Sequence, residues 1–200
     1  LGISYLNTLS NVWDKATRGY IQGAKESVAK RYQEENEPLK KASYFYLNAY
    51  IDLLDIYQES WDEKGNKAWS LEGDFDQQRF RYKFQSLETT TIDNLLKTRE
   101  MYSEEIDKSI YNYFNPLVLK LRYATAYDLY TLYLGGYQDD LAYEEASKIL
   151  QIQRNYGLEL TDNDYAMFTF IGITASKRKD WCNAYYAFDS ANKIKDYLDK

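Results

Sequence analysis

The chain has 200 residues, of which 44% are hydrophobic and 28% charged, an ordinary balance for a globular protein. It has only 2 prolines and 9 glycines, which favours long helices over a loop-rich β fold. Histidine is absent and there is one cysteine, so Ser-His-Asp and Cys-His nucleophilic sites, histidine-ligated zinc and an internal disulfide are excluded. The net charge of −6 argues against a nucleic-acid partner, which would require a concentrated basic surface.

The first part of the sequence predicts long helices. Apolar residues recur every four positions from about residue 9 to residue 33, which indicates one helical stripe. Gly19, Gly23 and Ser27 run beside this stripe and predict close approach of a neighbouring helix. A second helix should begin at Pro38, whose missing N–H suits a first turn, with Asn36 as its cap.

The stretch from 79 to 84, RFRYKF, alternates like a strand. A longer helical series passes through Phe80, Phe84 and Leu87, so we expect a helix over 76–102 and a short helix over 104–113. No apolar run approaches the roughly 18 residues of a membrane span, so we expect no transmembrane segment.

The remaining sequence predicts helices joined by short connections. They cover about 116–134, 139–155, 161–177 and from Asp180 to near the end of the sequence. Gly135 and Gly136 are expected to end the first, Asp139 or Asp140 to cap the second, and Gly157 to lie just past its end. The prediction is one all-α domain, 1–200, of about seven or eight helices, with a long-helix part over 1–113 and antiparallel helix pairs over 114–200.

The last helix pair carries small and aromatic residues in a specific order. Its first helix has Phe168, Ile171, Gly172 and Ala175, its turn has Asp180 and Trp181, and its second helix has Ala184, Phe188 and Ala191. This order resembles the tetratricopeptide repeat (TPR) family over residues 165–196, with Ala175 in place of a tyrosine and Lys179 in place of a turn glycine. Residues 132–150 match less well and need a one-residue insertion. A generic helical bundle remains the alternative.

The resemblance implies a right-handed array of helix pairs that binds a peptide or protein in its inner groove. Inner-face positions would be Ala166, Thr169, Ile173, Ser176 and Lys177, for which plain solvent exposure is the competing interpretation. These positions lack the Lys and Asn pair with which some family members bind a C-terminal carboxylate. We also expect the final helix to pack on a partner or a second copy, because the terminal faces of repeat arrays need cover.

Few residues form a pattern typical of a catalytic or ligand-binding site. The sequence therefore predicts a non-catalytic interaction or scaffold module with no cofactor and no metal site. The acidic stretch 139–145, DDLAYEE, is interpreted as a helix cap with solvated acids, and Cys182 as a small buried side chain. A small-molecule or lipid binder with a tyrosine-lined cavity is the alternative, since 22 residues are tyrosine. A catalytic bundle acting through carboxylates is a third possibility, and the cellular compartment stays open.

Overall fold

The computed structural model describes residues 15–59, 77–157 and 162–198. This part of the chain contains seven α-helices, one 3-10 helix and no strand, which confirms the all-α prediction. The chain divides into two compact units between Tyr113 and Phe114.

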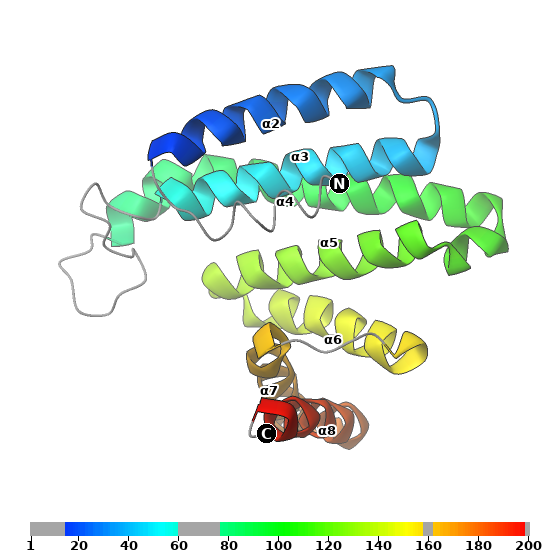
Figure 1. Cartoon of the computed structure of the whole chain (residues 1–200). Helices are drawn as coiled ribbons and strands as arrows, with labels where there is room; N and C mark the ends of the chain where they lie inside the picture. Colours follow the sequence, from blue (N-terminus) through cyan, green and yellow to red (C-terminus); the bar gives the residue numbers. More distant parts are fainter. Residues whose placement is uncertain (1–14, 60–76, 158–161, 199–200) are drawn as a thin grey trace. The chain divides into compact units, whose positions relative to one another are not determined.

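The first unit contains the helices α2 (Lys15–Glu34), α3 (Pro38–Glu59) and α4 (Gln77–Lys108). Figure 1 shows them side by side, and α3 packs against both α2 and α4. The predicted start of α3 at Pro38 is confirmed, and so is the helical interpretation of RFRYKF, whose described part lies in α4. The predicted break after residue 102 is wrong, because α4 continues to Lys108 and is followed by the 3-10 helix η1 (Ile110–Phe114).

The core between α2 and α3 is built from Ile21, Ile51 and Leu54, all at most 5% exposed. Lys25 of α2 also forms an ion pair with Asp52 of α3 at 3.1 Å. The prediction that small residues bring a helix close to α2 is wrong at Gly23. Gly23 is exposed, and a Cβ added there would meet nothing within 4 Å.

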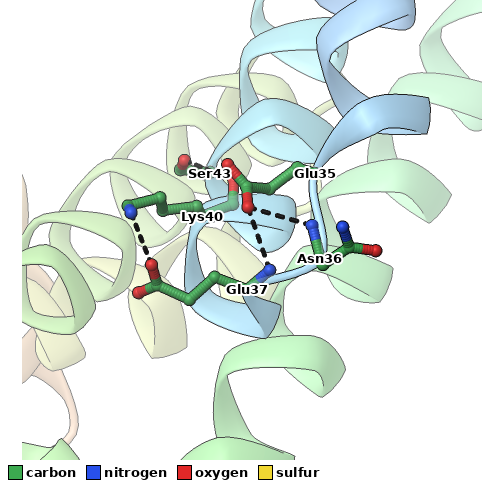
Figure 2. Close-up of polar contacts among 5 residues, drawn as sticks. All are labelled: Glu35, Asn36, Glu37, Lys40 and Ser43. Carbon is green, nitrogen blue, oxygen red and sulfur yellow. Dashed lines mark hydrogen bonds and ion pairs between the residues drawn. The ribbon is translucent and has the colours of Figure 1, made fainter.

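The turn between α2 and α3 is capped by a carboxylate (Figure 2). Glu35 Oε1 accepts hydrogen bonds from the backbone N–H groups of Glu37 and Asn36, both at 2.9 Å. These bonds, that of Glu37 first, and the nearby Lys40 ammonium lower the pKa of Glu35. Lys40 in turn pairs with Glu37 at 2.5 Å. Asn36 was predicted as the cap, but it takes part through its backbone, and the acceptor is the preceding side chain.

The second unit consists of two helical hairpins. The first joins α5 (Pro116–Gly135) to α6 (Asp139–Tyr156), and the second joins α7 (Asp162–Lys177) to α8 (Trp181–Leu198). Figure 1 shows α5, α6 and the α7–α8 hairpin following one another, and α6 packs on α7 and also contacts α8. The N-terminus of α5 is capped by Asn115, whose side chain accepts from the Leu117 N–H at 2.9 Å.

The turn between α5 and α6 ends α5 with two backbone hydrogen bonds of the Schellman type. The N–H of Tyr137 donates to Leu134 O at 3.1 Å, and the N–H of Gln138 donates to Tyr133 O at 2.8 Å. The left-handed residue of this motif is Tyr137, at φ 58°. The helix ends at Gly135 as predicted, with Gly136 as its C-cap, although neither glycine supplies the positive φ. Neither predicted aspartate caps α6, because its N-cap residue is Gln138 and makes no side-chain cap bond.

The turn between α7 and α8 repeats this geometry. The N–H of Lys179 donates to Ser176 O at 3.1 Å, and the N–H of Asp180 donates to Ala175 O at 2.9 Å. Lys179 is the left-handed residue, at φ 61°. Each residue of this turn lies 42 residues after its counterpart in the α5–α6 turn. At this spacing the two hairpins align without the insertion that the sequence comparison needed.

Buried positions correspond at the same spacing of 42 residues. In the first helix of each hairpin the matched core residues are Ala126 and Phe168, Leu129 and Ile171, and Tyr133 and Ala175. In the second helix they are Ala142 and Ala184, Ile149 and Ala191, and Ile152 and Ile194. The two hairpins therefore share their turns and part of their core pattern.

Candidate interaction surface

The leading helices of the two hairpins, α5 and α7, contact each other through side chains. The Tyr123 hydroxyl of α5 donates a hydrogen bond of 2.9 Å to Oδ1 of Asp164 in α7, and Asp164 is only 2% exposed. The Tyr130 ring of α5 lies 5.7 Å from the Phe170 ring of α7, centroid to centroid. Burial and the Asp164 carboxylate raise the pKa of Tyr123, because both disfavour the phenolate.

Tyr127 extends this aromatic cluster along α5. Its ring stacks on Tyr123 at 6.3 Å and meets Tyr130 edge-on at 6.2 Å. Burial raises the pKa of Tyr130 to about 12, and burial is also the main reason that the pKa of Tyr127 is raised. The three tyrosine rings of α5 pack on one another, and Tyr130 continues this packing to Phe170 of α7.

The five residues predicted to line a partner groove lie on one outward face of α7. Ala166, Ile173 and Lys177 are exposed, whereas Thr169 and Ser176 are half-buried. The Thr169 hydroxyl donates to the Tyr165 carbonyl at 2.9 Å, so it bonds within its own helix. We call this set the α7 face. The structure brings the five residues together, but exposure alone is also what a plain solvated surface would show.

Tyr165 belongs to the α7 face although the sequence interpretation missed it. It precedes Thr169 by one helical turn and is 40% exposed, while Ile173 is 46% exposed. The opposite side of α7 is buried, with Met167, Phe168, Ile171 and Ala175 at 1% exposure or less. An apolar residue beside a predicted inner position was the only signal that could have identified Tyr165.

The α7–α8 crossing is close at Gly172. A Cβ added to this glycine would lie 2.6 Å from Cε1 of Phe188, so the Phe188 ring occupies the place of the missing side chain. Ala184 and Ala191 are both 4% exposed on the same side of α8. Gly172 is therefore small where α7 and α8 approach each other closely.

Arg178, which directly follows α7, contacts the first hairpin. The Arg178 guanidinium lies 4.3 Å from the Tyr143 ring centroid of α6 and forms an ion pair with Asp140. A second arginine, Arg154 of α6, lies 3.7 Å from the Tyr186 ring centroid of α8. These contacts fasten the second hairpin to the first.

Two residues of the acidic stretch 139–145 also form ion pairs. Asp140 pairs with Arg178, and Glu145, only 5% exposed, pairs with Lys148 at 2.7 Å. Across the residues that the structure describes, no group of three or more Cys, Asp and Glu side chains is placed to hold a metal ion. In the same ranges, no helix is both long and apolar enough to cross a membrane.

Cys182 is exposed, which corrects the expectation of a buried side chain. The buried side of α8 carries Ala184, Ala187 and Ile194. Cys182 lies on another side of the helix, because residues two positions apart, such as Cys182 and Ala184, are separated by about 200° around the helix axis. The apolar neighbours in the sequence were therefore a poor guide to its surroundings.

Comparison with known protein families, curated proteins and solved structures gives no match to this chain.

Proposed function

We propose that this chain is a non-catalytic, TPR-like interaction module that binds a peptide or protein partner through the α7 face. The observation that carries the proposal is the pair of hairpins with one turn geometry, whose leading helices α5 and α7 contact each other through Tyr123 and Asp164. Stacked hairpins of this kind form the extended binding surfaces of helical repeat proteins. The spacing of 42 residues is longer than the roughly 34 of a TPR unit, so the likeness is one of arrangement.

The chemistry of the α7 face suits a mixed apolar and polar ligand. Ile173 and Tyr165 provide exposed apolar surface, and Ala166 is small enough for a ligand backbone to come close. Lys177 adds a positive charge at the end of the face. We therefore expect a segment with an apolar anchor and an acidic residue, rather than a free carboxylate held by a Lys and Asn pair.

Site-specific photo-crosslinking can test this proposal. A photoreactive residue replacing Ile173 in cells should give a defined adduct with one protein partner, and Ala166→Arg should abolish that adduct by blocking the surface. The matched control replaces Lys193, an exposed residue of α8. An adduct that also forms from position 193, or one that survives Ala166→Arg, would contradict binding at the α7 face.

The alternative is a small-molecule or lipid binder, and the tyrosine cluster of α5 is the observation that favours it. The rings of Tyr123, Tyr127 and Tyr130 already pack on one another, which favours a structural role for them. Native mass spectrometry separates the two proposals. A small ligand that co-purifies with the chain and is lost in Tyr127→Ala would support the alternative.

A further inference from the structure

The exposed surface of α7 continues onto α5 through aromatic rings. Tyr127 of α5 and Phe170 of α7 are both half-buried, and both contact the ring of Tyr130, at centroid distances of 6.2 Å and 5.7 Å. Phe170 precedes Ile173 by three residues, so it lies beside this exposed residue of the α7 face. A ligand on the α7 face can therefore extend across Phe170 to Tyr127 of the neighbouring helix.

A lysine lies at each end of this aromatic surface. Lys120 precedes Tyr127 by seven residues, and Lys177 follows Phe170 by seven residues. Seven residues are about two helical turns, so each lysine lies on the same side of its helix as the aromatic residue, about 10 Å from it. Both lysines are exposed. We call Lys120, Tyr127, Phe170, Ile173 and Lys177 the two-helix strip.

The two lysines lie in opposite directions from the rings. The contacts between α5 and α7 advance in the same direction along both helices, because Tyr123 contacts Asp164, and the later residue Tyr130 contacts the later residue Phe170. The lysine of α5 lies toward the start of its helix, and the lysine of α7 toward the end of its helix. About 10 Å along each helix and about 8–10 Å between two packed helices give a separation of roughly 20–25 Å.

The charge of the two-helix strip is positive, in a chain with a net charge of −6. The carboxylates of Asp128 and Asp164 do not lie open beside it, because these residues are only 6% and 2% exposed. Among the residues that the structure describes, neither Lys120 nor Lys177 is paired with a carboxylate. A ligand with a carboxylate at each end and apolar side chains between them would complement this distribution.

We propose that the two-helix strip binds an extended segment of another protein, with two acidic residues about six to eight positions apart and apolar residues between them. An extended chain rises about 3.3 Å per residue, so this length spans the roughly 20–25 Å between the lysines. The inference rests on the proposed function, because it extends the α7 face onto α5. Lys120 and Lys177 bind the two side-chain carboxylates, and the segment needs no chain terminus.

Synthetic peptides of alternating leucine and serine test the spacing. Each is acetylated and amidated, so its only charges are two glutamates, separated by about three, about seven or about eleven positions, or about 10, 23 or 36 Å when extended. Fluorescence anisotropy with an uncharged dye should show the tightest binding at the middle separation, by about two- to fivefold over the others. Equal affinity at all three separations overturns the proposal, and so does a lack of binding by all three.

Lysine variants locate the peptide on the chain. Lys120→Gln and Lys177→Gln should each weaken binding of the peptide with the middle separation by about two- to fivefold, the worth of one exposed ion pair. Lys195→Gln removes an exposed lysine of α8 and is the matched control, which should bind like the wild type. Lys120→Glu should bind more tightly than the wild type to a peptide in which one glutamate is replaced by lysine. An equal loss in the control overturns the proposal.

The same variants separate this inference from the proposed function. Weakening by Lys177→Gln with no effect of Lys120→Gln would confine the ligand to α7, which overturns the two-helix strip and leaves the α7 face as the binding surface. Binding that depends on both lysines supports the strip. The proposed function has its own readout, the photo-crosslink from Ile173 and its loss in Ala166→Arg, which does not depend on Lys120.

Discussion

Gly172 of α7 and Phe188 of α8 share one space: the aromatic ring lies where a Cβ of the glycine would be, 2.6 Å from the nearest ring carbon. Helix propensity favours alanine over glycine at position 172 by about 1 kcal/mol, but the ring must move to admit the methyl group. Because Phe188 is 38% exposed, it can swing outward and lose its packing on α7. The balance between these two effects decides the stability of a Gly172→Ala variant.

We expect Gly172→Ala to lower the free energy of unfolding by about 1 kcal/mol, since overpacking a contact costs about 1–3 kcal/mol and exceeds the gain in propensity. In a Phe188→Ala background the same substitution should raise the free energy of unfolding by about 0.5–1 kcal/mol. Urea denaturation of the four proteins of this double-mutant cycle measures both values. An equal effect in the two backgrounds would show that the ring does not oppose the methyl group.

The two turn residues with positive φ offer a second prediction. Tyr137 and Lys179 adopt a left-handed conformation that costs a non-glycine residue about 1–2 kcal/mol, part of which the flexibility of glycine in the unfolded chain offsets. Tyr137→Gly and Lys179→Gly should each raise the free energy of unfolding by about 0.5–1 kcal/mol. Glu144→Gly, in the interior of α6, is the control and should lower it by a similar amount. Chemical denaturation checks all three, and a loss of stability in Lys179→Gly would argue against strain at this turn.

Alkaline pH should destabilise the second unit through Tyr130. Burial raises its pKa from 10.0 to about 12, so between these values the folded chain holds a proton that the unfolded chain has lost. The stability that this tyrosine contributes is complete below pH 10 and is lost as pH rises toward 12. Urea midpoints of the wild type should therefore fall more steeply over this range than those of Tyr130→Phe. Parallel curves for the two proteins would contradict the assignment.

The carboxylate cap between α2 and α3 predicts an effect at acid pH. The pKa of Glu35 is lowered from 4.5, chiefly by the backbone N–H of Glu37, so its contribution to stability is present above pH 4.5 and lost as pH falls through the lower folded value. Glu35→Gln should lower the Tm at pH 7 and have little effect at pH 2. Thermal unfolding followed by circular dichroism at both pH values tests this, with Glu34→Gln as the neighbouring control. The same loss of Tm at pH 2 would point to a cause other than the ionised cap.

Local signals predicted most helix boundaries correctly. Pro38 begins α3, Pro116 begins α5, and Gly157 ends α6 in a left-handed conformation at φ 59°. Asp180 caps α8, because its Oδ1 accepts the N–H of Asn183 at 3.2 Å. Such features depend on residues within one turn of the boundary, and the sequence contains that information directly.

Features that depend on the neighbouring helix were not predicted. Gly23 is small, but a Cβ added to it would meet no described atom within 4 Å, and Cys182 is apolar but exposed. The neighbouring helices determine which side of a helix is packed. The partner of Asp164 is Tyr123, which lies 41 residues earlier in the chain, and nothing local to either residue indicates that pairing. The α7 face was predicted by family likeness, and its binding role stays a prediction.

The matching turns also bear on how such a chain can change length. The α5–α6 and α7–α8 turns have the same hydrogen bonds 42 residues apart. The segment 139–180 therefore begins directly after the last residue of the first turn and ends with the last residue of the second turn. A tandem duplication of the DNA encoding this segment would join residue 180 to a second residue 139 and leave every turn intact. The protein would gain one complete helix pair without a new type of turn. Duplication of whole helix pairs is therefore a way in which a gene encoding this architecture can lengthen.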